Sequence, residues 1–160
     1  MSEVVEPTPP PQHLMGAALD FLRAEGWPTP RRIDRETIEL DFGREDVPWT
    51  CYLEAREEER QVLFYTTLNV QTPAERILAM LEFIARANFG LAVGNFELDP
   101  DDGEIRFKTS VDVNNTELTR GLLSGLTSLN VAAVHVYLPA IEAVIAGAEP
   151  RGAIAAVEEG

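Results

Sequence analysis

The residues of this sequence that could do chemistry are few and stand apart from one another. Its two histidines are His13, at the start of a helical pattern, and His135, inside an apolar helical segment. A catalytic base or a metal site needs neighbours that orient and charge the imidazole, and neither histidine has them at a ligand spacing. We therefore interpret His135 as a structural or interface residue.

Cys51 is the only cysteine, which excludes a disulfide framework and a cysteine-based zinc cluster. It alternates in phase with Trp49 and Leu53, so we expect its side chain to point into the core. A buried cysteine behaves as a small hydrophobic residue, and no histidine lies near it in the sequence to activate it as a nucleophile.

The acidic run from Asp99 to Glu104 suggests a calcium loop but does not fit one. With Gly103 at the sixth place of an EF-hand loop, Leu98 and Pro100 would occupy ligand positions. A hairpin turn explains the run better, because Asp and Gly supply turn geometry. Phosphate-binding loops, dinucleotide fingerprints and zinc-protease motifs do not occur either. The sequence therefore predicts no catalytic residue, no metal and no cofactor, and hence a protein that is not an enzyme.

Charge and hydropathy narrow the partners and the compartment. The chain has 27 acidic and 13 basic residues, a net charge of −14, which opposes binding to nucleic acid or to anionic lipid. The N-terminal sequence lacks the basic and apolar regions of a signal peptide. The most apolar stretch, residues 131–148, is interrupted by His135, Pro139 and Glu142 and should not span a membrane. We expect a cytoplasmic protein that binds neither nucleic acid nor membrane.

The first half of the chain reads as an arm, a helix and three strands. Prolines at positions 7, 9, 10 and 11 predict a disordered arm over residues 1–11. Helical spacing follows from Gln12 and stops at Gly26. Period-two alternation then predicts half-buried strands over 37–42, 49–56 and 62–70.

The second half reads as a helix, a hairpin and a long helix. Thr72 and Glu75 form a capping box for a helix ending near Asn88. Strands on either side of the acidic turn follow, and then a long helix reaches Gly147, which Pro139 should kink or split. The apolar stripe of the first of these helices is expected to be Ile77, Leu78, Leu81, Ile84 and Ala85.

These elements predict an antiparallel α+β fold with the order α-β-β-β-α-β-β-α. A single domain should cover residues 12–148, and residues 149–160 should form a loose tail.

Several apolar side chains lie off the expected core faces. They are candidates for a partner-binding or dimer surface: Tyr52, Leu63, Tyr65, Val131, Val136 and Leu138. Either a neighbouring helix covers them or they form a surface for self-association or peptide binding.

The segment from Ile77 to Gly147 resembles the YbjN family of bacterial sensory transduction regulators. The likeness rests on the runs LEFIARANFGLAVGNFELDPDDGEIRFKTSVDV and LTRGLLSGLTSLNVAAVHVYLPAIEAVIAG. The family pattern is a helix ending in Asn, then G-x-F-x-L-D and D-G-E-I-R-F, and later an aromatic-proline step. The residues that match it are Asn88, Gly94, Phe96, Leu98, Asp99, Asp102 to Phe107, and Tyr137 through Pro139. The segment Val134–Tyr137 departs from the family, where more polar aromatic residues are usual.

The resemblance implies a fold like that of type III secretion chaperones, which are small, acidic and usually homodimeric. Such chaperones hold extended client segments on apolar patches, and the resemblance supplies no catalytic residue.

We therefore expect a non-catalytic protein-binding module, chaperone-like or regulatory, that forms a homodimer and binds a protein partner of unknown identity. The alternative is an enzyme or small-ligand protein with a cryptic pocket between sheet and helices, lined by groups such as Cys51, His135 or Glu54. A third possibility is a structural subunit of a larger complex.

Overall fold

A computed structural model of the protein describes residues 11–42 and 44–160. Its centre is one six-stranded antiparallel sheet with the strand order β1-β2-β3-β4-β6-β5. The elements are α1 (Leu14–Ala24), β1 (Arg31–Arg32), β2 (Thr37–Leu40), β3 (Trp49–Arg56), β4 (Gln61–Gln71), a 3-10 turn (Ala74–Arg76), α2 (Ile77–Gly90), β5 (Asn95–Leu98), β6 (Glu104–Asp112), α3 (Arg120–Ile145) and α4 (Pro150–Glu158).

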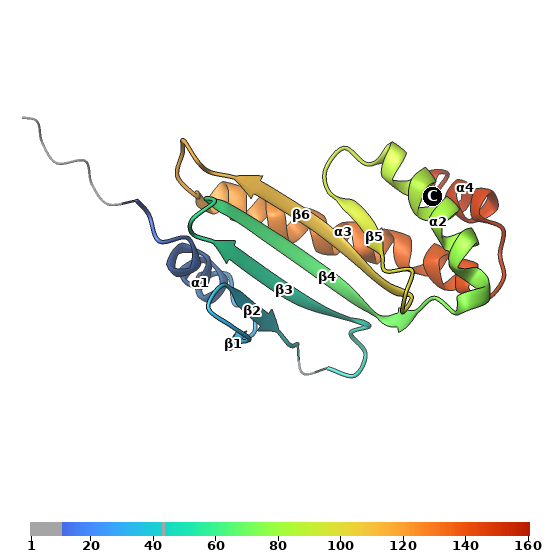
Figure 1. The fold of residues 1–160 in the computed structure, drawn as a ribbon, viewed down its shortest axis with the longest axis horizontal. Coiled ribbons are helices and arrows are strands. Elements are labelled where there is room, and N and C mark those ends of the chain that lie inside the picture. Colours follow the sequence, from blue (N-terminus) through green and yellow to red (C-terminus); the bar gives the residue numbers. More distant parts are fainter. Residues whose placement is uncertain (1–10, 43) are drawn as a thin grey trace, which may run out of the picture.

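The helices are all on one side of the sheet. α1 and the long α3 lie behind the strands, and the face of the sheet toward the viewer carries no helix (Figure 1). α2 and α4 pack side by side at the end of the molecule remote from α1, and α4 also packs on α3. The alternation of buried and partly exposed residues along β3 and β6 follows from this one-sided cover.

The predicted α+β class, antiparallel sheet and element order are confirmed, with two additions. The short strand β1 adds a sixth strand at the edge of the sheet beside β2. Residues 150–158, predicted as part of a loose tail, instead form α4. Pro150 sits in the first turn of this helix, where proline is tolerated, and Ala153 and Ile154 are buried in the core. That burial stabilises a helix too short to form alone.

Pro139 does not split the last helix, which runs unbroken from Arg120 to Ile145. Proline removes the hydrogen bond to the carbonyl four residues earlier, here that of His135. Both His135 and Pro139 are exposed, so water can satisfy that carbonyl and the helix continues.

The N-terminal arm predicted for residues 1–11 falls almost entirely outside the described residues. The single domain predicted for residues 12–148 remains a prediction. α4 lies beyond its predicted end and packs on α2 and α3.

The core has two parts that meet at Trp49. The first lies beneath α1 and the N-terminal half of α3 and includes Leu53 and Phe64. The second lies between the sheet, α2, α4 and the C-terminal half of α3 and includes Phe83 and Phe107. α3 therefore holds both parts together.

A buried asparagine on α3 fixes this helix to the middle of the sheet. Asn130 is fully buried, and its Nδ2 lies 2.9 Å from the carbonyl oxygen of Phe64 on β4 and 3.2 Å from that of Phe107 on β6. The same nitrogen lies 3.1 Å from Oγ1 of Thr109, whose hydroxyl donates to the carbonyl of Leu126. These contacts fix both the position of α3 along the sheet and its rotation.

We predict that Asn130→Ala lowers the free energy of unfolding by about 2–4 kcal/mol, because it leaves buried acceptors without their donor. Asn130→Asp should cost at least as much, since a carboxylate cannot donate to the two carbonyls. Urea titration followed by circular dichroism measures both. Ser124→Ala, at an exposed site on the same helix, is the control and should change stability little. Equal stability of all three variants would contradict the role given to Asn130.

Candidate protein-binding surface

Helix α2 is apolar on two opposite faces. Its inward face buries Met80, Phe83, Ile84 and Ala87 in the second part of the core. Its outward face exposes large apolar side chains, with exposed fractions of 81% for Leu78, 41% for Leu81 and 96% for Phe89. Large apolar side chains gathered on an exposed helix face are typical of protein-binding surfaces, so the outward face of α2 is the candidate binding surface.

This result corrects the predicted stripe of α2. Of its five residues, only Ile84 lies in the buried set, whereas Leu78, Leu81 and Ala85 are exposed. The helix carries two apolar stripes about half a turn apart, and the prediction took the outward one as the core. Met80, Phe83 and Ala87 are the core residues that it missed.

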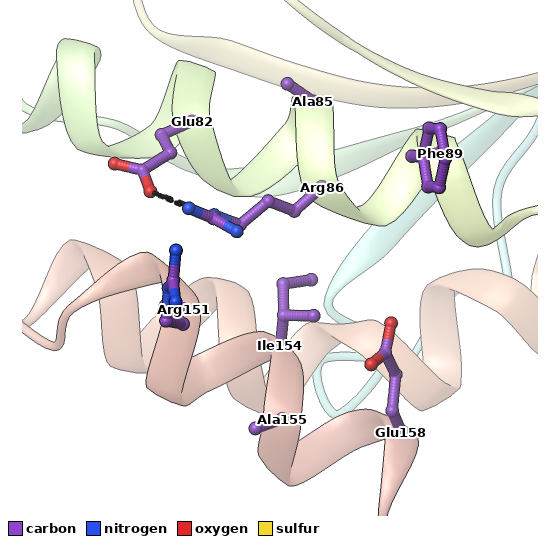
Figure 2. Close-up of a pocket in the computed structure, with 8 residues that line it drawn as sticks. All are labelled: Glu82, Ala85, Arg86, Phe89, Arg151, Ile154, Ala155 and Glu158. Atoms are coloured by element: carbon purple, nitrogen blue, oxygen red, sulfur yellow. Dashed lines mark hydrogen bonds and ion pairs between the residues drawn. The ribbon is translucent and has the colours of Figure 1, made fainter.

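A groove runs between α2 and α4 beside this outward face. Its volume is about 680 Å³, and Figure 2 shows the residues that line it. From α2 and α4 these are Glu82, Ala85, Arg86, Phe89, Arg151, Ile154, Ala155 and Glu158.

The charges of the groove are divided between its ends. Arg86 donates to Glu82 at 2.8 Å, and Arg151 lies at the same end (Figure 2). Glu158 and Phe89 lie at the other end. Ile154 lies between the two ends and points toward α2. The groove thus has the apolar Ile154 at its middle, charges of both signs at one end and the negative charge of Glu158 at the other.

The three candidate residues on α3 lie in different environments. Val136 is 54% exposed and lines a shallow groove of about 380 Å³ between α3 and α4. Val131 is half-buried against the first part of the core, and Leu138 is half-buried against the second. Of the three, Val136 is therefore the most accessible to a partner.

The three candidates on the sheet are brought together on the face that carries no helix. Tyr52 and Tyr65 are directly opposite each other on β3 and β4, and Leu63 is the next residue but one along β4. Leu63 is only 8% exposed, because its neighbours on the open face cover it. The guanidinium of Arg106 lies 4.4 Å above the centre of the Tyr65 ring. Whether this patch binds a partner remains a prediction.

Ion pairs surround the tyrosines on the open face. Burial raises the pKa of Glu97, but hydrogen bonds from Lys108 and Arg106 outweigh this and lower the pKa below its usual value. Burial raises the pKa of Tyr52 and of Tyr65, so both keep their phenolic protons at neutral pH. The open face is thus largely charge-paired and offers neutral hydroxyl donors.

The groups named for a cryptic catalytic pocket are scattered. Cys51 is fully buried on the helix-covered face, Glu54 is on the opposite face where it pairs with Arg56, and His135 is exposed on α3. Burial raises the pKa of the Cys51 thiol to about 11, against which the contact of 3.4 Å with the Thr66 hydroxyl acts only weakly. A thiol of this kind is a poor nucleophile at neutral pH. Within residues 11–42 and 44–160, no group of three or more metal-binding side chains occurs.

We predict that Cys51 makes stability fall with pH between about 9 and 11. The unfolded thiol loses its proton near 9.0 and the folded one near 11, so in this window the folded state holds the extra proton. The free energy of unfolding should therefore decrease as pH rises, by at most about 2–3 kcal/mol. Urea titrations of wild type and Cys51→Ala at pH 7, 9, 10 and 11 measure the difference. A constant difference across this range would contradict the prediction.

An apolar pocket does exist between the sheet and α3, where the alternative hypothesis placed one, but of the three groups named for it only His135 is among its lining residues. Its volume is about 650 Å³, and it contains both tryptophans of the chain. It is lined by Trp27, Phe42, Val47, Trp49, Thr127, Ser128, Val131, Ala132 and His135. The indole nitrogen of Trp49 is buried and has no hydrogen-bond partner among the described residues. The pocket holds no Asp, Glu, Lys or Arg, so it suits an uncharged group.

Among the described residues, α3 is the one helix whose length and composition would allow it to cross a membrane. Its residues Leu123, Asn130 and Val134 pack on the sheet, which gives its apolar character a structural explanation.

The residues of the sequence motif after α2 hold the β5–β6 hairpin in place. Asn88 at the end of α2 accepts from the amide of Phe96 at 2.8 Å and donates to its carbonyl at 3.0 Å. Phe96 packs edge-on against Phe107 and Tyr137. At Gly103, with φ +81°, a Cβ would lie 2.1 Å from the carbonyl oxygen of Thr72, so no other residue fits this turn.

Residues 19–143 match the model of the YbjN family, whose description is "Putative bacterial sensory transduction regulator". The chain belongs to the YbjN family. The motif above lies within the matched residues, and in this chain Asn88, Phe96 and Gly103 serve packing and turn geometry. None of the curated protein sequences matches this YbjN chain.

Solved structures show a similar fold at low sequence identity. The crystal structure of YbjN from E. coli, described as a putative transcription regulator, has a TM-score of 0.57 and 11% identity, covering 82% of this chain and 87% of that one. The ExsC–ExsE complex gives a TM-score of 0.51 and 14% identity, covering 76% and 88%. This YbjN protein therefore has a fold like that of type III secretion chaperones, as predicted.

Proposed function

We propose that this protein is a non-catalytic, cytoplasmic protein-binding module, chaperone-like or regulatory, that works by burying apolar surface against a protein partner or a second copy. The observation that supports this most is the outward face of α2, where Leu78 and Phe89 are 81% and 96% exposed. The low reactivity of Cys51 and the scattered positions of His135 and Glu54 support a role without catalysis.

The composition of this face is that of a binding surface. Aromatic residues are enriched among the residues that dominate binding energy, and a ring of polar residues usually surrounds them. Here Phe89 and Leu81 are flanked by the paired charges of Glu82 and Arg86. The structural neighbours include a complex of two proteins, ExsC with ExsE, which is consistent with a fold that binds protein.

The net charge of −14 favours a partner that presents basic residues. The open face of the sheet, with Tyr52, Leu63 and Tyr65, is a second place where an extended segment could lie. Its hydroxyl donors and paired charges fit a polar peptide better than the bare apolar face of α2 does.

We predict that Phe89→Ser weakens association strongly without unfolding the protein. Because Phe89 is almost fully exposed, its loss should change the free energy of unfolding by less than about 0.5 kcal/mol. At the centre of an interface the same change should weaken binding by about 2 kcal/mol, roughly thirtyfold. Light scattering of the purified protein, together with pull-down from the native cytosol, measures self-association and partner capture.

The control is Ile33→Ser, which removes an apolar side chain that is 45% exposed at the other end of the molecule. It should leave mass and captured proteins unchanged. If Phe89→Ser also leaves both unchanged, the outward face of α2 is not a binding surface and the proposal fails.

A second candidate function, binding of a small uncharged apolar ligand, rests on the pocket that contains Trp27 and Trp49. We predict saturable quenching of tryptophan fluorescence when the uncharged dye N-phenyl-1-naphthylamine is added, since both tryptophans of the chain line this pocket. Val131→Phe fills the pocket and should abolish the quenching. Val136→Phe, on α3 outside the pocket, should not. Quenching that does not saturate, or that both variants retain, would exclude this function.

A further inference from the structure

We propose that the pocket containing Trp27 and Trp49 binds a neutral amphipathic molecule, with its apolar body on the aromatic wall and a hydroxyl or carbonyl group against α3. Ser128 and His135 are the hydrogen-bonding groups that receive this polar end. The inference rests on the second candidate function above and names the chemical class of its ligand.

The pocket has one apolar wall and one mixed wall. The apolar wall comes from the first half of the chain and consists of four half-buried side chains: Trp27, Phe42, Val47 and Trp49. The mixed wall is one side of α3, whose lining residues recur at helical spacing over two turns: Thr127, Ser128, Val131, Ala132 and His135. A ligand in the pocket therefore has apolar rings on one side and the helix on the other.

Packing inside the protein holds the aromatic wall in place. The ring centre of Trp27 lies 5.9 Å from that of Phe42 and 5.8 Å from that of Phe64, which it meets edge-on. Phe64 is fully buried in the first part of the core. The amide of Trp27 also donates to the carbonyl of Leu22 on α1 at 2.9 Å. The wall is thus formed before any ligand binds, as is usual for small-molecule sites.

Of the described residues that line the pocket, two present polar side chains that a ligand can reach. The hydroxyl of Thr127 is buried and donates to the carbonyl of Leu123 at 3.0 Å, and the indole nitrogen of Trp49 is buried within its wall. Ser128 and His135 are exposed, and within residues 11–42 and 44–160 neither side chain has a hydrogen-bond partner. Serine and neutral histidine each supply a donor and an acceptor, so either can bind a hydroxyl or a carbonyl group.

The same lining disfavours a charged ligand. Among the described residues of the pocket there is no Asp, Glu, Lys or Arg, so an ionised group would lose water without gaining a counter-charge. The net charge of −14 adds repulsion for an anion. A neutral hydroxyl or carbonyl group loses less on entering, and one hydrogen bond to α3 offsets that loss.

The two polar side chains are too far apart to bind one group together. Ser128 and His135 are two turns apart, or about 10 Å along the axis of α3. A ligand with a single polar group therefore binds one of them, and the test replaces both.

The experiment compares four probes that share a naphthalene ring system, which fits within the volume of about 650 Å³. The substituent is a neutral hydroxyl in 2-naphthalenemethanol, apolar in 2-methylnaphthalene, anionic in 2-naphthoate and cationic in 2-naphthylmethylammonium. Equilibrium dialysis of the full chain against each probe, at about pH 7.5, gives the dissociation constants. The alcohol should bind wild type at least tenfold more tightly than either ion.

Replacing the polar groups of α3 separates the hydrogen bond from the apolar contacts. In Ser128→Ala/His135→Ala the alcohol should bind about fivefold more weakly, because its hydroxyl loses its partner, whereas 2-methylnaphthalene should bind as it does to wild type. Both substitutions are at exposed sites, so the fold should be retained, which circular dichroism checks. Ser124→Ala, one turn earlier on α3 and outside the lining, is the matched control and should change neither constant.

An ion that binds as tightly as the alcohol, or an alcohol that the double variant binds as tightly as wild type does, would overturn the inference. If the dye N-phenyl-1-naphthylamine still binds wild type saturably and Val131→Phe blocks it, the second candidate function stands with a ligand of another class. If neither the dye nor any of the four probes binds saturably, both fail together.

Discussion

The contact of Asn130 with the two central strands is the constraint on which the rest of the structure depends. An amide nitrogen buried in the core is costly unless it is hydrogen-bonded, and the contacts of Asn130 Nδ2 with Phe64 and Phe107 meet that need only in the observed position of α3, although its Oδ1 has no partner among the described residues. α3 in turn carries α4, and α4 supports α2. The contacts of this one polar side chain, together with the apolar packing of α3, therefore help to place both α4 and α2.

Placing α2 at the end of the sheet explains why one of its apolar faces has no cover. The sheet and α3 occupy the inward side, where Phe83 and Met80 are fully buried, and α4 reaches only one flank. No further element of the described chain is available for the outward side. Exposure of Phe89 is thus a consequence of how the described elements are arranged.

The sequence was informative where its pattern had a single interpretation. Strict alternation in β3 and β6 predicts their buried faces correctly, because a shift of one residue would expose every apolar side chain. α2 was predicted as a helix but with the wrong buried face, since both stripes are apolar and periodicity cannot choose between them. α4 was missed because its stability comes from Ala153 and Ile154 packing on distant residues.

Asn130 itself was a signal that went unused: an amide amid apolar residues indicates a buried hydrogen-bond network. The candidates Tyr52, Leu63 and Tyr65 were grouped correctly on one face, but the groove required α4.

The residues that pack the end of α2 and the exposed residues of the proposed binding surface are different side chains. Asn88, Phe96 and Gly103 lie within the matched residues 19–143 and join α2 to the hairpin, so their replacement would disturb packing. Phe89 immediately follows Asn88 but points away from the core, so the packing that preserves the fold places no demand on it. α4 lies wholly beyond the matched residues 19–143. One side of the groove thus lies within the residues that match the family model, and the other side lies beyond them. The exposed side chains of Phe89, Arg151 and Glu158 can therefore change without any change to the core that holds the two helices in place.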